Sequence, residues 1–163
     1  MKKSFLFIIA ASLFLSMSLA SLTNAQLASK KVITLDLAKK IAAAAEAEAV
    51  KNKLTVVVTI LDDGGNLIYL EKMDNTQIGS IEVAIKKAKT SVYFKRPSKT
   101  FEDMVVNGRN AIIALPGALP IEGGLPLMVD GQPAGAIGVS GGTSQQDGMV
   151  AKAGADFFDA QLK

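Results

Sequence analysis

Residues 119–148 read LPIEGGLPLMVDGQPAGAIGVSGGTSQQDG, and this stretch decides the fold. It contains two apolar runs, Leu125 to Val129 and Ala134 to Ser140, on either side of Asp130-Gly131. A short apolar run bounded by turn residues predicts a strand, and Asp-Gly between two such runs predicts a hairpin. The stretch therefore predicts two antiparallel strands.

A closing helix follows this hairpin. The second strand runs into Gly141-Gly142, and Thr143 or Ser144 can cap a helix that we expect to continue through Leu162. Glycine at the join provides the backbone freedom that a sharp strand-to-helix turn requires.

A second hairpin is predicted nearer the N-terminus. The run Leu54 to Leu61 is β-branched and apolar at nearly every position, which is typical of a buried strand. The segment Asp62 to Asn66 reads DDGGN and predicts a turn, after which NLIYLEK resumes the strand pattern.

Three further helices are expected. Thr34 can cap one that begins TLDLAKKIAAAAEAEAV, and a short one is expected from Thr100 to about Val106. Between them, Ser80 can cap a helix whose apolar residues recur at helical spacing. We expect these residues to form its buried stripe: Ile81, Ala84, Ile85, Ala88 and Val92.

The order of elements predicts the fold class. Tight hairpins make a sheet mostly antiparallel, and helices that are apolar on one face must bury that face against another element. The economical arrangement is an α+β domain in which helices sandwich an antiparallel sheet. We find no internal repeat, linker or low-complexity tract in the sequence.

The first 25 residues have the pattern of a signal peptide. Lys2 and Lys3 precede an apolar run, and small residues follow up to an expected cut before Gln26. The alternative is an uncleaved anchor helix, which needs about 20 predominantly apolar residues. This segment is interrupted by Ser12, Ser16, Ser18 and Ser21. We therefore expect a signal peptide at 1–25, a leader at 26–33 and a domain at 34–163. The protein should then be located in the periplasm or outside the cell, and we expect no stable membrane insertion once the signal is removed.

The composition excludes several kinds of chemistry. The 163 residues include no cysteine and no histidine, so disulfides, thiolate or imidazole metal sites and Ser-His-Asp triads are absent. A net charge of +3, with no basic block interleaved with aromatic residues, predicts no nucleic-acid partner.

The turn Gly141, Gly142, Thr143 and Ser144 is a candidate ligand site. It opens a helix, where backbone N–H groups point outward at the positive end of the helix dipole and can receive a carboxylate or phosphate. The alternative is a tight turn that needs glycine for geometry alone, and no lysine follows as it does in a phosphate loop.

Carboxylates outside the regular helical faces give other candidates. Glu71 and Asp74 are close enough in sequence to share a surface metal ion such as iron, and Glu122 precedes two glycines on a bent backbone. Asp62-Asp63-Gly64-Gly65-Asn66 lacks the alternating oxygens of a calcium loop and is better explained as a hairpin turn.

From about Thr34 to the C-terminus the chain resembles the GlcG/HbpS family, whose members are also described as haem-degrading or PduO C-terminal-like domains. Long segments carry the resemblance in the same order: ILDDGGNLIYLEKMDN, GSIEVAIKKAKTSVYFKRPSKTFED, LPIEGGLPLMVDGQPAGAIGVSGGTSQQDG and AKAGAD. The resemblance implies a profilin-like α/β/α fold with a five-stranded antiparallel sheet, and a homo-oligomer.

The resemblance also implies a ligand, because the family includes secreted haem-binding proteins. This chain departs from the relatives that hold haem iron with histidine, so any haem must be bound without imidazole. Its iron must then be held by a hydroxyl, methionine, tyrosine or lysine side chain, or by no protein ligand. Met73 and Tyr93 are the first candidates for that role, and Arg96 is placed to reach the haem propionates. The remaining candidate side chains are Tyr69, Thr76, Thr100, Met104 and Met128.

Two functions are therefore expected, and they remain alternatives at this stage. The first is an exported protein that binds haem or another tetrapyrrole as a small-molecule ligand, with no other cofactor. The second, implied by the glycolate-linked relatives, is an enzyme or accessory protein acting on a small hydroxy- or oxo-acid, with Glu122 or Asp147 as base.

Overall fold

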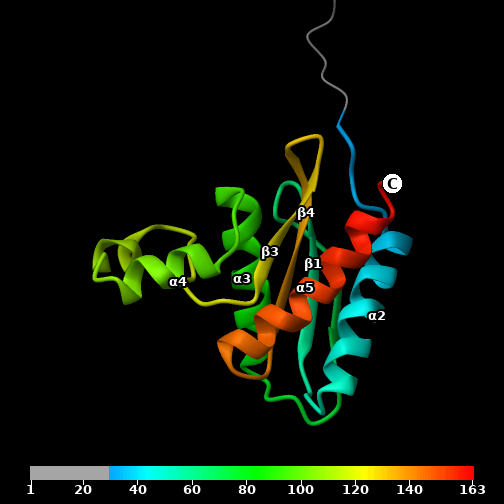
Figure 1. Cartoon of the computed structure of the whole chain (residues 1–163), viewed down its shortest axis with the longest axis horizontal. Helices are drawn as coiled ribbons and strands as arrows, with labels where there is room; N and C mark the ends of the chain where they lie inside the picture. Colours follow the sequence, from blue (N-terminus) through cyan, green and yellow to red (C-terminus); the bar gives the residue numbers. More distant parts are fainter. Residues whose placement is uncertain (1–29) are drawn as a thin grey trace, which may run out of the picture. The chain divides into compact units, whose positions relative to one another are not determined.

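The computed structural model describes residues 30–163, and residues 31–163 form one unit (Figure 1). The predicted signal peptide lies outside the described residues. The elements in chain order are α2 (Leu35–Lys51), β1 (Val57–Asp62), β2 (Leu67–Lys72), α3 (Ser80–Phe94), α4 (Lys99–Val106), the 3-10 helix η2 (Asn110–Ala114), β3 (Gly124–Val129), β4 (Gln132–Ser140) and α5 (Ser144–Ala160).

The sheet confirms both predicted hairpins. Its order is β2-β1-β4-β3, and all neighbouring strands are antiparallel. Between β1 and β2, the Asp62 carboxylate accepts hydrogen bonds from the backbone N–H groups of Gly64 (2.9 Å) and Asn66 (2.8 Å). Between β3 and β4, Asp130 and Gly131 both have positive φ, at 51° and 75°, as two-residue hairpin turns of type I′ require.

The expectation of five strands is wrong, because the described residues form four. The segment from 115 to 123 forms turns, and β3 begins only at Gly124. Pro116 and Pro120 lie in this segment and lack the N–H group that a strand needs for pairing. The α+β class with an antiparallel sheet is confirmed.

Helices cover both faces of the sheet (Figure 1). α2 and α5 pack against each other and on one face, while α3 packs on the other face against β1, β3 and β4. Side chains of a strand alternate between the two faces. Ile60 accordingly belongs to the larger core beneath α2 and α5, and its neighbour Leu61 to a smaller core with Ala88 and Val92 of α3.

α3 lies unusually close to the sheet because two paired glycines face it. Gly124 of β3 is opposite Gly138 of β4 in the strand register. A Cβ atom added to Gly138 would lie 2.1 Å from the backbone oxygen of Ala84, and one added to Gly124 would lie 2.2 Å from that of Lys87. The backbone of α3 therefore occupies the space that side chains would otherwise fill.

This close approach corrects the predicted orientation of α3. Ile81 and Ile85 are only partly buried, whereas Ser80, Ala84, Ala88 and Ser91 are buried. Only small side chains fit between a helix and a sheet at this distance, so α3 turns its small residues inward and leaves its isoleucines nearer the surface.

α4 and η2 extend away from α2 at the far side of α3 (Figure 1). Ser98 fixes the start of this segment. Its hydroxyl donates to the backbone oxygen of Ile121 (2.7 Å) and accepts from the backbone N–H of Gly124 (2.9 Å). The β3 end of the sheet and the beginning of α4 are thereby held together.

Candidate functional site

A groove of about 490 Å³ runs along the outer side of α3. Its volume is typical of sites for small organic ligands. Five side chains of α3 and a three-residue loop form the lining: Glu82, Ile85, Lys86, Lys89, Tyr93, Gly117, Ala118 and Leu119. The groove thus contains Tyr93 from the predicted site residues, together with Ile85, which the sequence pattern assigned to the core.

Thr90 holds the loop against the helix. Its hydroxyl accepts a hydrogen bond from the backbone N–H of Leu119 (2.7 Å) and donates one to the backbone oxygen of Lys86 (2.8 Å). Thr90 is buried, so water does not compete for these bonds. Both walls of the groove are therefore fixed to one side chain.

Tyr93 forms one end of the groove, and its ring packs beside two glycines, of which Gly65 leaves the space that the ring occupies. A Cβ on Gly65 would lie 2.4 Å from a ring carbon of Tyr93, and a Cβ on Gly117 would lie 3.5 Å from the opposite edge. Both glycines have positive φ, at 80° and 79°. The ring thus lies between the β1–β2 turn and the loop, and Tyr93 is still 49% exposed.

The groove carries a net positive charge. Lys86 and Lys89 contribute ammonium groups, and Glu82 is the acidic residue of the lining. Among the residues that the structure describes, neither lysine forms an ion pair. Apolar side chains beside uncompensated cations suit a ligand that is apolar in its body and anionic at its edge.

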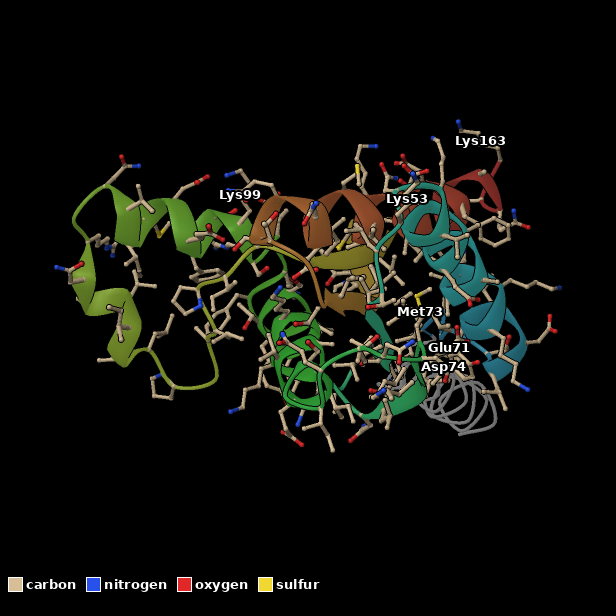
Figure 2. All side chains as sticks on the ribbon, turned by 90° about the horizontal axis from the view of Figure 1, so that it is seen from below. Lys53, Glu71, Met73, Asp74, Lys99 and Lys163 are labelled. Atoms are coloured by element: carbon tan, nitrogen blue, oxygen red, sulfur yellow. The ribbon has the colours of Figure 1, made fainter. Side chains whose placement is uncertain are left out.

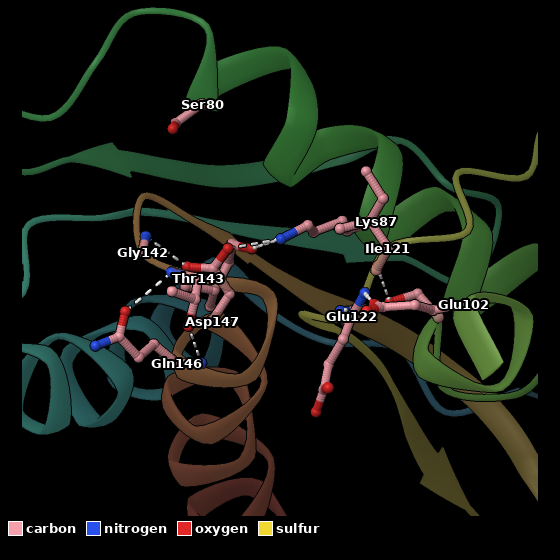
Figure 3. Close-up of polar contacts among 12 residues, drawn as sticks. Ser80, Lys87, Glu102, Ile121, Glu122, Gly142, Thr143, Gln146 and Asp147 are labelled. Carbon is pink, nitrogen blue, oxygen red and sulfur yellow. Dashed lines mark hydrogen bonds and ion pairs between the residues drawn. The ribbon is translucent and has the colours of Figure 1, made fainter. Parts of the chain in front are cut away.

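The Gly141–Ser144 turn is stabilised from within the protein. The Asp147 carboxylate accepts the backbone N–H of Gly142 at 2.9 Å, and the Gln146 side chain accepts that of Thr143 at 2.9 Å (Figure 3). The Thr143 hydroxyl accepts the N–H of Gln146 at 3.3 Å, which completes a capping box. The backbone N–H groups of Gly142 and Thr143, two of those predicted to bind an anion, therefore already donate hydrogen bonds within the protein.

The cap has a measurable consequence for stability. Replacing Thr143 with alanine removes the acceptor for the Gln146 amide, and we expect a loss of about 1 kcal/mol in the free energy of unfolding. Urea unfolding followed by circular dichroism measures this loss. Thr55→Ala is the matched control, because Thr55 is exposed outside any helix and its change should have almost no effect. Equal losses for the two variants would contradict the role of the cap.

Asp147 also forms a buried ion pair that the sequence pattern did not reveal. The Lys87 ammonium donates to the Asp147 carboxylate at 2.7 Å and to the backbone oxygen of Val139 at 3.1 Å (Figure 3). The side chains are only 1% and 3% exposed. A Cβ on Gly123 would lie 2.8 Å from the ammonium nitrogen, so this glycine leaves the space through which Lys87 reaches α5.

Glu122 occupies a different environment from Asp147. Its backbone N–H donates to the Glu102 carboxylate, and its own carboxylate lies 3.8 Å from the Lys99 ammonium and is 18% exposed. A Cβ on Gly148 would lie 2.3 Å from a Glu122 oxygen. Of the two predicted bases, Asp147 is enclosed by Lys87 and the turn amide, while Glu122 is partly open but does not line the groove.

Glu71 and Asp74 lie near the end of β2, away from Lys99 of α4 (Figure 2). Glu71 accepts a hydrogen bond from the Tyr69 hydroxyl at 2.6 Å. Burial and the nearby Glu71 carboxylate raise the pKa of Glu46 on α2. Within residues 30–163 no group of three or more acidic side chains is placed to hold a metal ion.

Comparison with known proteins identifies the family. Residues 33–156 match the family model described as "Haem degrading protein HbpS-like". The chain belongs to the HbpS-like family. Protein GlcG of Escherichia coli (strain K12) is 41% identical over 111 residues, which cover 68% of this chain and 83% of GlcG.

Two solved structures resemble this HbpS-like protein closely. A double mutant of Streptomyces reticuli HbpS has a TM-score of 0.76 at 30% identity and covers 82% of this chain and 92% of its own. A PduOC structure, solved as a haem complex, has a TM-score of 0.69 at 27% identity and covers 77% of this chain and 94% of its own. The resemblance inferred from the sequence segments is thereby confirmed.

Three of the residues predicted to contact haem in this HbpS-like protein make contacts elsewhere in the structure. Met73 packs against the larger core, and the buried Thr76 hydroxyl donates to the backbone oxygen of Val56. The Arg96 side chain donates to the backbone oxygen of Phe94 and lies over the ring of Phe101, 5.8 Å from its centroid. None of these side chains lines the groove, where Tyr93 is the predicted site residue that remains.

The described part of this HbpS-like protein contains no helix that is both long and apolar enough to span a bilayer.

Proposed function

We propose that this protein is exported and binds haem or a closely related tetrapyrrole in the groove along α3, without histidine ligation. The observation that carries the proposal is the lining of that groove, in which apolar side chains, two unpaired lysines among the described residues, and a tyrosine converge. The haem complex of PduOC supports the choice of ligand.

The donor set of the groove fits the chemistry of haem. Ile85, Ala118 and Leu119 provide apolar surface for the macrocycle. Lys86 and Lys89 provide cations for the two propionate carboxylates. Bound haem would supply an iron centre and its redox chemistry, while the protein's own residues would bind and orient the group and shield part of it from water.

Export and self-association belong to the same proposal. The N-terminal pattern of Lys2 and Lys3 before an apolar run supports a cleaved signal peptide and a location in the periplasm or outside the cell. The similarity to HbpS structures supports a homo-oligomer. Mass spectrometry of the N-terminus after expression in a bacterium tests cleavage before Gln26, and light scattering tests the oligomer.

The cationic groove predicts how haem affinity responds to charge. In Lys86→Glu/Lys89→Glu both attractive charges become repulsive. Since each exposed charge pair contributes up to about 1 kcal/mol, we expect haemin binding to weaken by about tenfold or more. Titration of the purified mature protein with haemin, followed by the Soret band, measures the dissociation constant.

A matched control separates the groove from net charge. Lys39→Glu/Lys40→Glu makes the same change in charge on the exposed side of α2, and it should bind haemin as the unmodified protein does. A haemin spectrum that never differs from that of free haemin would overturn the proposed function. Equal weakening in the two double variants would show that the binding site lies elsewhere.

A further inference from the structure

The chain has only two tyrosines, and the structure places them in contrasting environments. Tyr69 lies on β2 and Tyr93 near the end of α3. A phenol binds ferric iron after losing its proton, so the partner of each hydroxyl decides which tyrosine can act as a ligand.

Tyr69 is held in its protonated form. Its hydroxyl donates to the Glu71 carboxylate at 2.6 Å. This hydrogen bond, together with burial and the negative charge of Glu71, raises the pKa of Tyr69. Deprotonating Tyr69 would place a phenolate directly against a carboxylate.

Tyr93 has the opposite surroundings. Its hydroxyl forms no hydrogen bond with any residue in the range 30–163, and its ring lines the groove beside the loop. The nearest charged groups of that lining on the same helix are Lys89 and Lys86, one and two turns away.

The other groove residues are poorer iron ligands. A lysine ammonium group has three N–H donors and no free electron pair, so Lys86 and Lys89 suit propionates better than iron. Glu82 lies eleven residues before Tyr93, which is about 16 Å along the helix axis. Its carboxylate therefore lies toward the opposite end of the groove from the phenol.

We propose that Tyr93 is the protein ligand to ferric haem iron in this groove, a role that rests on the proposed haem-binding function. On binding, the O–H bond of Tyr93 would break and its proton would pass to solvent, and the phenolate oxygen would take the place of a water molecule on the ferric iron, which would leave to solvent. The iron stays ferric throughout, so no oxidant or reductant takes part. Gly65 leaves the space that the ring occupies, because a Cβ atom at this position would overlap it.

The test compares Tyr93→Phe with Tyr69→Phe, its matched control, in titrations with haemin and with metal-free protoporphyrin IX. Haemin bound to the unmodified protein should give phenolate vibrations in its resonance Raman spectrum. In Tyr93→Phe we expect these vibrations to vanish and haemin affinity to fall by about tenfold or more, equivalent to 1.4 kcal/mol. Protoporphyrin affinity should stay within about twofold, because phenylalanine keeps the apolar wall of the groove.

The two ligands distinguish the possible failures. If the unmodified protein binds neither haemin nor protoporphyrin, the proposed function fails and this role fails with it. If both ligands bind and the phenolate vibrations persist in Tyr93→Phe, only the assignment of Tyr93 is overturned. Loss of the vibrations in Tyr69→Phe would also overturn it, and circular dichroism of both variants confirms that each is folded.

Discussion

Gly138→Ala should destabilise the protein by at least about 3 kcal/mol, at the upper end of the range for overpacked cores. The added methyl group would lie 2.1 Å from the backbone oxygen of Ala84 and 2.8 Å from the Ala88 side chain. Neither atom can move by a change of rotamer, since one belongs to the helix backbone and the other is a Cβ. The whole of α3 must shift away from the sheet.

Gly79→Ala is the control for this prediction. Gly79 precedes α3, has a helical φ of −62°, and has no atom within 4 Å of an added Cβ. Its replacement should stabilise the protein by roughly 0.4–1 kcal/mol, because alanine has fewer conformations to lose on folding. Urea unfolding of the two variants measures both effects. A loss below 1 kcal/mol in Gly138→Ala would show that α3 does not lie against the sheet as described.

Lys87→Met should cost about 3–5 kcal/mol, because it leaves the Asp147 carboxylate buried without a cation. The amide of Gly142 would remain as a partner of Asp147, but one hydrogen bond does not replace a paired charge. The double variant Lys87→Met/Asp147→Leu removes both charges, and we expect it to recover most of the lost stability. The free energy of unfolding of the three proteins, measured in urea, tests this order.

An exposed ion pair provides the comparison. Lys99 lies 2.8 Å from Asp103, and both side chains are about half exposed. Lys99→Met should therefore change the stability very little, because water already solvates the partner that remains. A similar loss in Lys87→Met and Lys99→Met would contradict the burial of the Lys87–Asp147 pair.

The parts of the fold that local chemistry determines were predictable from the sequence. DDGGN and Asp130-Gly131 predict hairpins because glycine, aspartate and asparagine adopt the backbone angles that such turns need. Thr34 caps α2 as predicted, with its hydroxyl accepting the N–H of Leu37 at 3.3 Å. Thr143 caps α5 for the same reason. Each of these features depends on residues within four positions of one another.

Features that depend on distant segments were not predictable in this way. The orientation of α3 follows from Gly124 and Gly138, which lie more than 30 residues later in the chain. Helical spacing alone favoured Ile81 and Ile85 as core residues, whereas the space available beside the glycines favours Ala84 and its small neighbours. The five-stranded sheet was implied by the family resemblance and not by a local pattern, and the described residues form four strands.

In the candidate site, too, some features were predictable from nearby residues and others depended on distant segments. Tyr93 was one of the two first candidates for the haem ligand, and it does line a groove. The cationic side chains of that lining are Lys86 and Lys89, however, and not the predicted Arg96. Lys87 was missed, although a lysine among small residues on one helix face is a signal for a buried charge. Its partner Asp147 is 60 residues away, so spacing could not reveal the pair.

The double hydrogen bond of Thr90 has a consequence for the kinetics and affinity of ligand binding. Because this side chain joins the loop to the helix by hydrogen bonds within the protein, the groove is preorganised. A ligand entering it does not need to order the loop, so little conformational entropy opposes association. If haem binds in this groove as proposed, few contacts would be enough for a given affinity.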